Sequence, residues 1–325
     1  MGSPLIQSVR IRNYRCFEDV EAPLGHLTVL IGQNDTGKSA FLEALALLRQ
    51  PKLTGSSLQR DVRNMNTDLS VEIFQCKNDK WTGFIVRPED KNPRINNPNT
   101  VKTAFYQLPS KGPAMGCQGL DDRKGPPDLD PAGGNVPALV DYFLRRDRAR
   151  FDSFVKDARQ RIPGLKDIHV GTPGGSYRQL DLVMEKGAKI PADRSSAGVR
   201  IIIFFLALAY HPVPPELLLI EEPESGVHPK RLEDIVKLLR GLTRGEHANH
   251  PVQIVLSTHS PYLLDAIDPS DDQVLIFRRE KHGARSIEPA DTSLLALFLD
   301  EFSLGEVWFN QEEDGLVSKD KESVS

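Results

Sequence analysis

The chain has 325 residues, of which 26% are charged and 39% are hydrophobic, and its formal net charge is −4. This composition is that of an ordinary protein with a large core, and the net charge excludes an overall basic field for nucleic acid. The longest apolar run, residues 201–210, is too short to span a bilayer. Three cysteines without metal-binding spacing, and no visible signal peptide, lead us to expect a cytoplasmic protein.

The first predicted elements are strands. Residues 5–13 alternate between apolar and polar side chains as an edge strand does, and residues 14–21 continue toward a second strand. Residues 27–31 are predominantly apolar, which is typical of a short buried strand. Residues 40–48 have the period and composition of a helix.

A glycine-rich loop joins this strand to this helix. It reads Gly32-Gln33-Asn34-Asp35-Thr36-Gly37-Lys38-Ser39, and it matches G-x-x-x-x-G-K-[ST] without a mismatch. The glycines let backbone N–H groups turn toward a phosphate chain, and the helix N-terminus adds its dipole. We expect Lys38 to reach the β- and γ-phosphates and Ser39 to hold Mg²⁺. The loop, extended to Ala40, is therefore predicted to bind ATP; the alternative is a chance glycine turn before a helix.

The next segment is predicted to be mostly strand and loop. Residues 69–76 and 81–87 pair as a hairpin, and residues 101–108 return as a strand. Residues 109–136 hold many glycines and prolines with little apolar periodicity, so a long loop is predicted there.

Residues 136–162 are predicted to be helical, with a bend at the charged stretch 145–150. This segment carries a basic cluster formed by Arg145, Arg146, Arg148, Arg150, Lys156, Arg159 and Arg161. A solvated helix face is favoured here over a nucleic-acid site.

The remaining predicted elements are strands at 168–170 and 179–185, a helix at 195–210, a strand at 217–220, a helix at 229–242, a strand at 252–257, and a hairpin of 274–279 with 284–288.

Two of these strands end in polar residues. Glu221 and Glu222 follow residues 217–220, and ligands of an open α/β sheet bind at the carboxyl ends of its strands. Glu221 is predicted to orient Mg²⁺ and Glu222 to position the attacking water; a polar strand end before a turn is the alternative.

The strand at 252–257 leads into Thr258 and His259. A histidine beside the nucleotide can sense the γ-phosphate by hydrogen bonding. The strand–Ser–Thr–His order favours this role for His259 over that of a bystander.

These three motifs together resemble the ATPase head of the ABC class, of the kind found in SMC, RecF and OLD proteins rather than in transporters. The segments NYRCFED and LLLIEEPESGVHP are similar to the OLD (overcoming lysogenization defect) family and its AAA-type relatives. Glu221 departs from the broader class, in which the first acidic residue is usually Asp. The resemblance implies an α/β fold, an ABC-type P-loop ATPase head that has a mixed central sheet, an antiparallel β lobe and an inserted helical lobe.

We therefore expect a single ATPase domain over residues 1–310, followed by a polar tail at 311–325. Within it, residues 1–108 form the β lobe with the phosphate loop, and residues 109–200 form the helical lobe with a signature segment. Residues 201–310 form the core that carries the acidic pair and the histidine.

The resemblance further implies that the signature segment acts on the ATP of a partner subunit. Ser196 and Gly198, at the start of a helix, would supply donors to that γ-phosphate; a plain helix N-cap is the alternative. The resemblance also implies a glutamine that links the strand lobe to the helical lobe. Gln107 is the first candidate and Gln75 the second. Arg15 either approaches the nucleotide or is a surface arginine.

The resemblance implies an ATPase that forms a dimer or higher oligomer around ATP and gates an effector. OLD nucleases carry a metal-dependent Toprim domain after the head, and the residues after His259 lack its carboxylate pattern. We therefore expect a separately encoded nuclease or toxin as effector, in bacterial anti-phage defence, and no membrane partner. The alternatives are a RecF-like repair ATPase, with DNA as partner, and an ATP-dependent scaffold with little turnover.

Overall fold

The computed structural model describes residues 4–47, 69–75, 80–86, 101–119, 125–173, 175–247, 250–279, 285–290 and 304. The chain divides into two compact units. The first comprises Met1–Phe105, Pro215–Glu222 and Gln253–Ser325, and the second comprises Tyr106–Pro214 and Pro223–Val252. The expected acidic pair therefore ends a segment of the first unit, whereas the expected signature segment belongs to the second.

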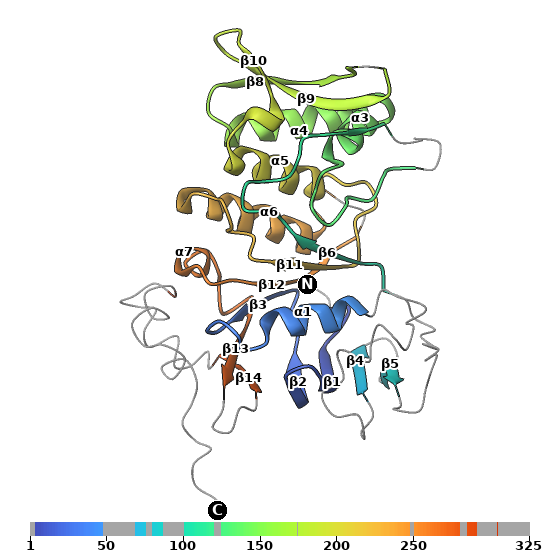
Figure 1. Ribbon diagram of the computed structural model, residues 1–325, viewed down its shortest axis with the longest axis vertical. Coiled ribbons are helices and arrows are strands. Elements are labelled where there is room, and N and C mark those ends of the chain that lie inside the picture. Colours follow the sequence, from blue (N-terminus) through green and yellow to red (C-terminus); the bar gives the residue numbers. More distant parts are fainter. Residues whose placement is uncertain are drawn as a thin grey trace, which may run out of the picture. The chain divides into compact units, whose positions relative to one another are not determined.

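The first unit is organised around a six-stranded sheet in the order β14-β13-β3-β12-β11-β6 (Figure 1). Its strands are β3 (Leu27–Ile31), β6 (Thr103–Gln107), β11 (Leu217–Glu221), β12 (Gln253–Ser257), β13 (Gln273–Arg279) and β14 (Arg285–Pro289). The last two residues of β6, Tyr106 and Gln107, are counted with the second unit. Strand β12 pairs in parallel with β3 and β11, β13 pairs in parallel with β3, and β14 is antiparallel to β13. The carboxyl ends of β3, β12 and β11 consequently meet at one edge of the sheet.

These strands are central because they are apolar on both faces. Every residue of β3 and β12 is buried, and so are the first four residues of β11. A parallel strand covered on both faces needs such a continuous apolar run. The predicted strands at 27–31, 217–220 and 252–257 are confirmed, and so is the hairpin that β13 and β14 form.

A second, antiparallel sheet of the first unit has the order β2-β1-β4-β5. Its strands are β1 (Ser8–Tyr14), β2 (Phe17–Pro23), β4 (Leu69–Gln75) and β5 (Lys80–Val86). The hairpin of β4 and β5 is confirmed. The prediction of an edge strand at 5–13 is wrong, because β1 pairs with β2 on one side and with β4 on the other. Alternation of apolar and polar side chains along a strand indicates that one face of the sheet is buried. It does not indicate whether the strand has a neighbouring strand on one side or on both.

Helix α1 (Lys38–Leu47) packs against β11 and β12 and shares one apolar core with both sheets. Phe41 of α1 meets Phe277 of β13 edge to face, with 5.4 Å between ring centroids. Phe17 of β2 meets the same ring at 6.4 Å. Aromatic packing therefore joins the helix that follows the phosphate loop to the six-stranded sheet and, through Phe277, to the antiparallel sheet.

The second unit contains a smaller antiparallel sheet and helices. Its strands are β7 (Gly116–Gln118), β8 (Leu165–Gly171), β9 (Tyr177–Met184) and β10 (Lys189–Pro191), with β9 paired to each of the others. Helices α3 (Val136–Arg146) and α4 (Arg148–Arg161) pack on this sheet. The predicted helical bend is confirmed at Asp147, whose side chain caps α4 by accepting from the Arg150 N–H at 3.1 Å.

The prediction of a loop throughout 109–136 is wrong at β7. This strand has three residues, begins with glycine and lacks alternation, so it forms through its pairing with β9 rather than through a local preference. Strand β10 escapes sequence analysis for the same reason, because it too has three residues and pairs with β9.

Helix α5 (Ala197–Ala209) lies between α4 and α6 (Leu232–Arg244) in the second unit. Its residues from Ile201 onward are all buried, as expected of a helix that is apolar on every side. Helix α6 is preceded by one 3₁₀ turn, Pro229–Arg231, so the helix predicted at 229–242 begins in a different geometry. A four-residue helix of the first unit, α7 (Pro261–Leu264), was not predicted.

Candidate active site

The predicted phosphate loop connects β3 to α1 and adopts a conformation that needs its two glycines. Gly32 has φ +147° and Gly37 has φ +108°. A Cβ on Gly32 would lie 2.4 Å from the Phe277 carbonyl oxygen, and one on Gly37 would lie 2.8 Å from the Phe17 ring. Neither position has room for a side chain, so the loop backbone is pressed against β2 and β13 and its shape is set before a ligand arrives.

The Lys38 side chain is folded back into this loop. Its ammonium donates to the carbonyl oxygens of Gly32 at 2.7 Å and Gln33 at 2.8 Å, and the residue is only 5% exposed. A buried cation needs such partners. The Thr36 hydroxyl also donates to the Gln33 carbonyl, at 2.8 Å. The loop therefore presents a fixed cation inside a glycine cradle, which is the donor set that a polyphosphate chain requires.

The hydroxyl of Ser39, at the start of α1, donates a hydrogen bond to the Glu221 carboxylate at the end of β11. The two side chains are 182 positions apart in the sequence, and the parallel pairing of β3, β12 and β11 brings them together. A hydroxyl and a carboxylate are oxygen ligands of the kind that Mg²⁺ takes beside substrate phosphates. The donor set fits Mg²⁺, whose chemistry there would be neutralisation of phosphate charge. The described residues contain no cluster of three or more His, Cys, Asp or Glu side chains arranged for a metal.

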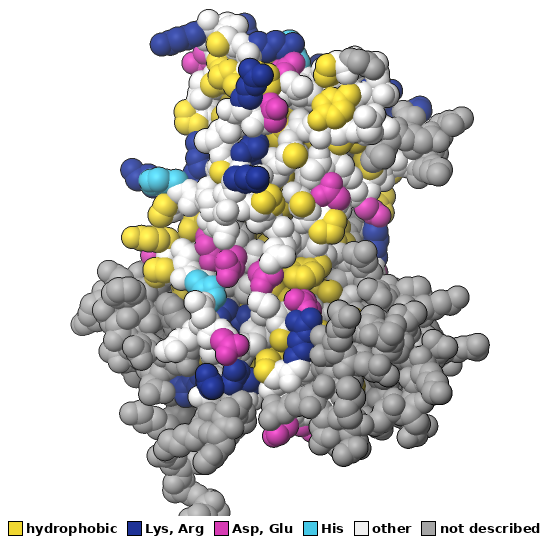
Figure 2. All heavy atoms as spheres, in the orientation of Figure 1, with side chains coloured by type: hydrophobic (Ala, Val, Ile, Leu, Met, Phe, Trp, Pro, Cys, Tyr) yellow, Lys and Arg dark blue, Asp and Glu magenta, His cyan; other side chains and the backbone are white. Residues whose placement is uncertain are grey.

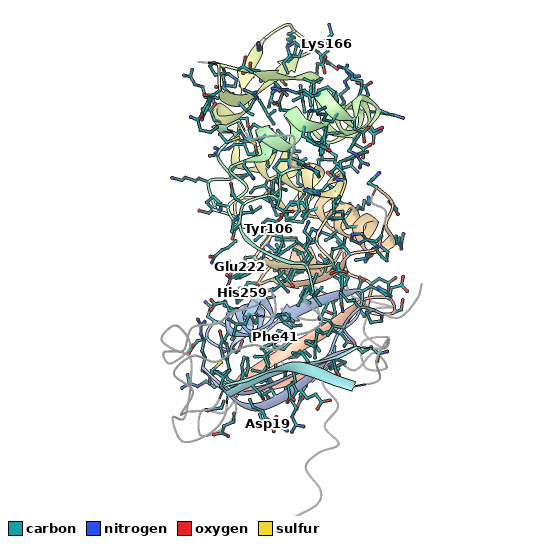
Figure 3. The ribbon with its side chains drawn as sticks, turned by 90° about the vertical axis from the view of Figure 1, so that its right-hand side faces the viewer. Asp19, Phe41, Tyr106, Lys166, Glu222 and His259 are labelled. Carbon is teal, nitrogen blue, oxygen red and sulfur yellow. The ribbon has the colours of Figure 1, made fainter. Side chains whose placement is uncertain are left out.

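Glu222 follows β11 in a left-handed conformation, with φ +45°, and its N–H donates to the Ser257 carbonyl at 3.1 Å. Non-glycine residues rarely adopt this conformation, and such residues cluster at functional sites. The turn directs the Glu222 carboxylate toward His259, whose Nε2 lies 3.6 Å from Oε1 (Figure 3). Both side chains remain partly exposed, at 44% and 35%, so both can reach a ligand.

His259 follows β12, which lies between β3, the strand that leads into the phosphate loop, and β11, the strand that leads into Glu222. The Thr258 N–H donates to the Leu30 carbonyl of β3 at 3.1 Å, and the Thr258 hydroxyl accepts from the Ser260 N–H at 3.0 Å. Burial lowers the pKa of His259, the Lys38 cation lowers it further, and Glu222 opposes both. The neutral form of His259 is therefore favoured, and a neutral imidazole can both donate and accept a hydrogen bond.

The structure thus brings together the predicted residues Gly32 to Ala40, Glu221, Glu222 and His259 in the first unit. Ser196, Gly198 and Gln107 belong to the second unit. Ser196 caps α5, since its hydroxyl accepts from the Val199 N–H at 3.4 Å. Gln107 ends β6 with its side chain exposed. The side chain of Gln75 lies outside the described residues.

Sequence analysis did not predict one contact of the loop region, between Asp35 and Arg285, and it left two roles open for Arg15. Asp35, at the exposed tip of the loop, pairs with Arg285 of β14 at 3.3 Å. No motif signals Arg285, because it lies 250 positions away on a short strand. Arg15, for which two roles were open, forms an ion pair with Glu43 of α1.

Two family models match the chain. The model described as "AAA ATPase domain" matches residues 5–103, and the model described as "AAA domain, putative AbiEii toxin, Type IV TA system" matches residues 121–265. The first match contains the phosphate loop, and the second contains the acidic pair and His259.

Two curated relatives resemble the chain at low identity. An "OLD nuclease" of Thermus scotoductus is 22% identical over 320 residues, which cover 80% of this chain and 60% of the relative. The chain thus spans about three fifths of the length of that nuclease. A "Probable ribonucleotide transport ATP-binding protein mkl" of Mycobacterium leprae is 22% identical over 308 residues, which cover 92% of this chain and 69% of the relative.

The fold is similar to a solved SMC head bound to the C-winged helix domain of ScpA. The TM-score is 0.60 at 13% identity, with 89% of this chain and 99% of the other covered. The chain is an ATP-hydrolysing P-loop ATPase whose ABC-type head is similar to those of OLD and SMC proteins. Among the described residues, no helix has both the length and the apolar character that crossing a membrane requires.

Proposed function

We propose that this ATPase dimerises around two ATP molecules and that hydrolysis gates an effector. Each ATP is held by Lys38 and, through Mg²⁺, by Ser39 and Glu221 of one chain. Glu222 of that chain positions the attacking water, and neutral His259 contacts the γ-phosphate. The Ser196 segment of the second chain completes the site, with its helix N-terminus toward the γ-phosphate.

The observation that carries this proposal is the exposed beginning of α5. Ser196 is exposed, and a Cβ on Gly198 would meet no atom closer than 3.9 Å, whereas the rest of the helix from Ile201 is buried. The small size of Ser196 and Gly198 themselves is therefore not required by close packing within the chain. Their N–H and hydroxyl donors are available to an anion that is supplied by another molecule.

The proposals for the effector and for the biological setting rest on the similarity of this chain to named relatives. The relative in Thermus scotoductus is named a nuclease, and one family description names a toxin system. We extend the proposal to a nuclease or toxin effector, encoded as a separate protein, whose activity in anti-phage defence depends on the ATP state of the dimer. ATP binding and ATP hydrolysis would then interconvert two states of the dimer, and the effector would be active in one of them.

DNA is less favoured as the partner, because the basic cluster of α3 and α4 is largely paired with carboxylates. Its ion pairs are Arg145 with Asp141, Arg148 with Asp152, Arg150 with Asp147, and Arg161 with Asp157. Lys, Arg, Asp and Glu side chains are interspersed on the face in Figure 2. Such pairing fits the solvated helix face favoured by the sequence, since a DNA-binding surface needs an uncompensated positive field.

The test uses Ser196→Arg, which would place a bulky cation at the dimer seam. We expect each chain to keep ATP binding, because its own phosphate loop is untouched, and to lose both hydrolysis and ATP-dependent dimerisation. Thr172→Arg, which adds the same cation at another exposed position of the second unit, is the matched control and should retain both. Light scattering with ATP and phosphate release are the measurements.

Mixing Ser196→Arg chains with Lys38→Ala chains sharpens the test. Each mixed dimer has one site with both defects and one site with neither, so turnover should return. Normal hydrolysis by Ser196→Arg alone would leave Ser196 as a helix cap and would overturn the shared site.

A further inference from the structure

Asp35 is an unexpected residue at the mouth of a phosphate-binding loop. It has φ +64°, a conformation usually given to glycine, and its carboxylate is 84% exposed. A negative charge at this position opposes the entry of a triphosphate, because like charges repel. The loop therefore needs a compensating cation for Asp35 in addition to Lys38, whose charge is directed into the glycine cradle.

Arg285 is built to supply that cation. Its Nη2 lies 3.3 Å from the Asp35 Oδ2, and its side chain is 8% exposed, so the guanidinium is held by its surroundings rather than mobile in solvent. It comes from β14, whose partner β13 also supports the loop, because the Phe277 backbone lies directly against Gly32. One hairpin thus contacts the loop at its first glycine and at its tip.

We propose that Arg285 is a positioning residue of the ATP site, which acts through Asp35. The ion pair neutralises the Asp35 carboxylate and anchors the left-handed turn of the loop, so that the triphosphate enters a cradle without an opposing charge. This inference rests only on ATP binding at Lys38, and it is independent of dimerisation and of the effector.

The test is a double-mutant cycle on the dissociation constant for ATP in the full chain. Arg285→Ala should weaken ATP binding about five- to tenfold at low salt, and the loss should shrink as salt screens the exposed carboxylate. Asp35→Asn should not weaken binding, since it removes the carboxylate that opposes the triphosphate. The double variant should bind ATP like Asp35→Asn alone, because Arg285 then has no Asp35 carboxylate to neutralise. The losses should appear in KM rather than in kcat.

Arg279→Ala is the matched control, because Arg279 is exposed and lies directly opposite Arg285 in the β13–β14 register. It removes the same charge from the same hairpin and should leave affinity within about twofold. If Arg285→Ala weakens ATP binding by the same factor in the Asp35→Asn background as in the original chain, Arg285 contacts the nucleotide itself or supports the fold, and the proposal is overturned. An original chain that binds no ATP would instead overturn the ATPase assignment.

Discussion

The edge of the six-stranded sheet and the N-terminal end of α5 are built by different means. At the sheet edge, the ends of three neighbouring parallel strands lead into the phosphate loop with Lys38, into Glu222 and into His259, and the pairing of those strands brings these residues together. At α5, three chain segments meet through close backbone approach. A Cβ on Gly226 would lie 1.9 Å from the Ser110 carbonyl oxygen, and one on Gly112 would lie 3.1 Å from Ala197.

Side-chain hydrogen bonds to backbone carbonyls reinforce this second region. Arg200, in the first turns of α5, donates to the Lys111 carbonyl, and Arg231 donates to the Arg161 carbonyl at 2.6 Å. The difference teaches where each region is vulnerable. At the sheet edge a substitution should remove chemistry and leave the fold, whereas around α5 the addition of one methyl group should disturb the backbone.

The largest effect is expected from Lys38→Ala at the sheet edge. It should abolish ATP binding, because the cation held between the Gly32 and Gln33 carbonyls is lost. Lys237→Ala, which removes an exposed cation paired with Glu233 on α6, should bind ATP normally. Titration with a fluorescent ATP analogue measures both. Unchanged affinity in a folded Lys38→Ala chain would refute the assignment of the phosphate loop.

Glu222→Gln should keep ATP binding and reduce turnover by a factor on the order of 10² or more, because the water loses its positioning group. It should also trap the ATP-bound dimer. Glu221→Gln is the comparison within the pair, and its defect should depend on Mg²⁺ concentration, since Glu221 contacts Ser39. Steady-state kinetics across a Mg²⁺ series separates the two. If Glu221→Gln blocks hydrolysis and Glu222→Gln does not, the two roles are reversed.

Gly226→Ala tests the second region, and Gly187→Ala is its matched control. The two glycines have nearly the same φ, +80° and +81°, but a Cβ on Gly187 would meet nothing within 4 Å. Both variants bear the left-handed strain of about 1–2 kcal/mol, and Gly226→Ala must also displace the Ser110 carbonyl, at about 1–3 kcal/mol more. Thermal unfolding should place Gly226→Ala about 3–6 °C below Gly187→Ala. Equal melting temperatures would remove the distinction between the regions.

The smallest effect concerns the pKa of His259 without nucleotide. Burial and Lys38 lower it, so NMR titration should give a value below the ordinary 6.5 or so. Lys38→Ala should raise this pKa, and Glu222→Gln should lower it further. Below about pH 6.5 the unfolded chain binds a proton here that the folded chain resists, so stability falls as the pH drops through this range. A value above 6.5 would contradict the packing at the sheet edge.

Much of the sheet edge could be predicted from the sequence alone. The phosphate loop, the acidic pair and His259 each follow a short apolar run, and a parallel sheet places the ends of such runs together. The sequence also indicated the helix at 195–210 and the bend within 145–150, because capping and charge patterns are local; the structure places their caps at Ser196 and Asp147. For these elements the information lies within one strand or one turn.

Only the tertiary structure revealed the features that depend on residues far apart in the sequence. Alternation predicted β1 but not its place inside a sheet, and β7 exists only through β9. Arg285 meets Asp35 across 250 positions, and Gly226 has no room beside Ser110, with no local pattern to announce either contact. Pairing, close approach and charge compensation join residues through space, and sequence spacing records only what neighbours along the chain can do.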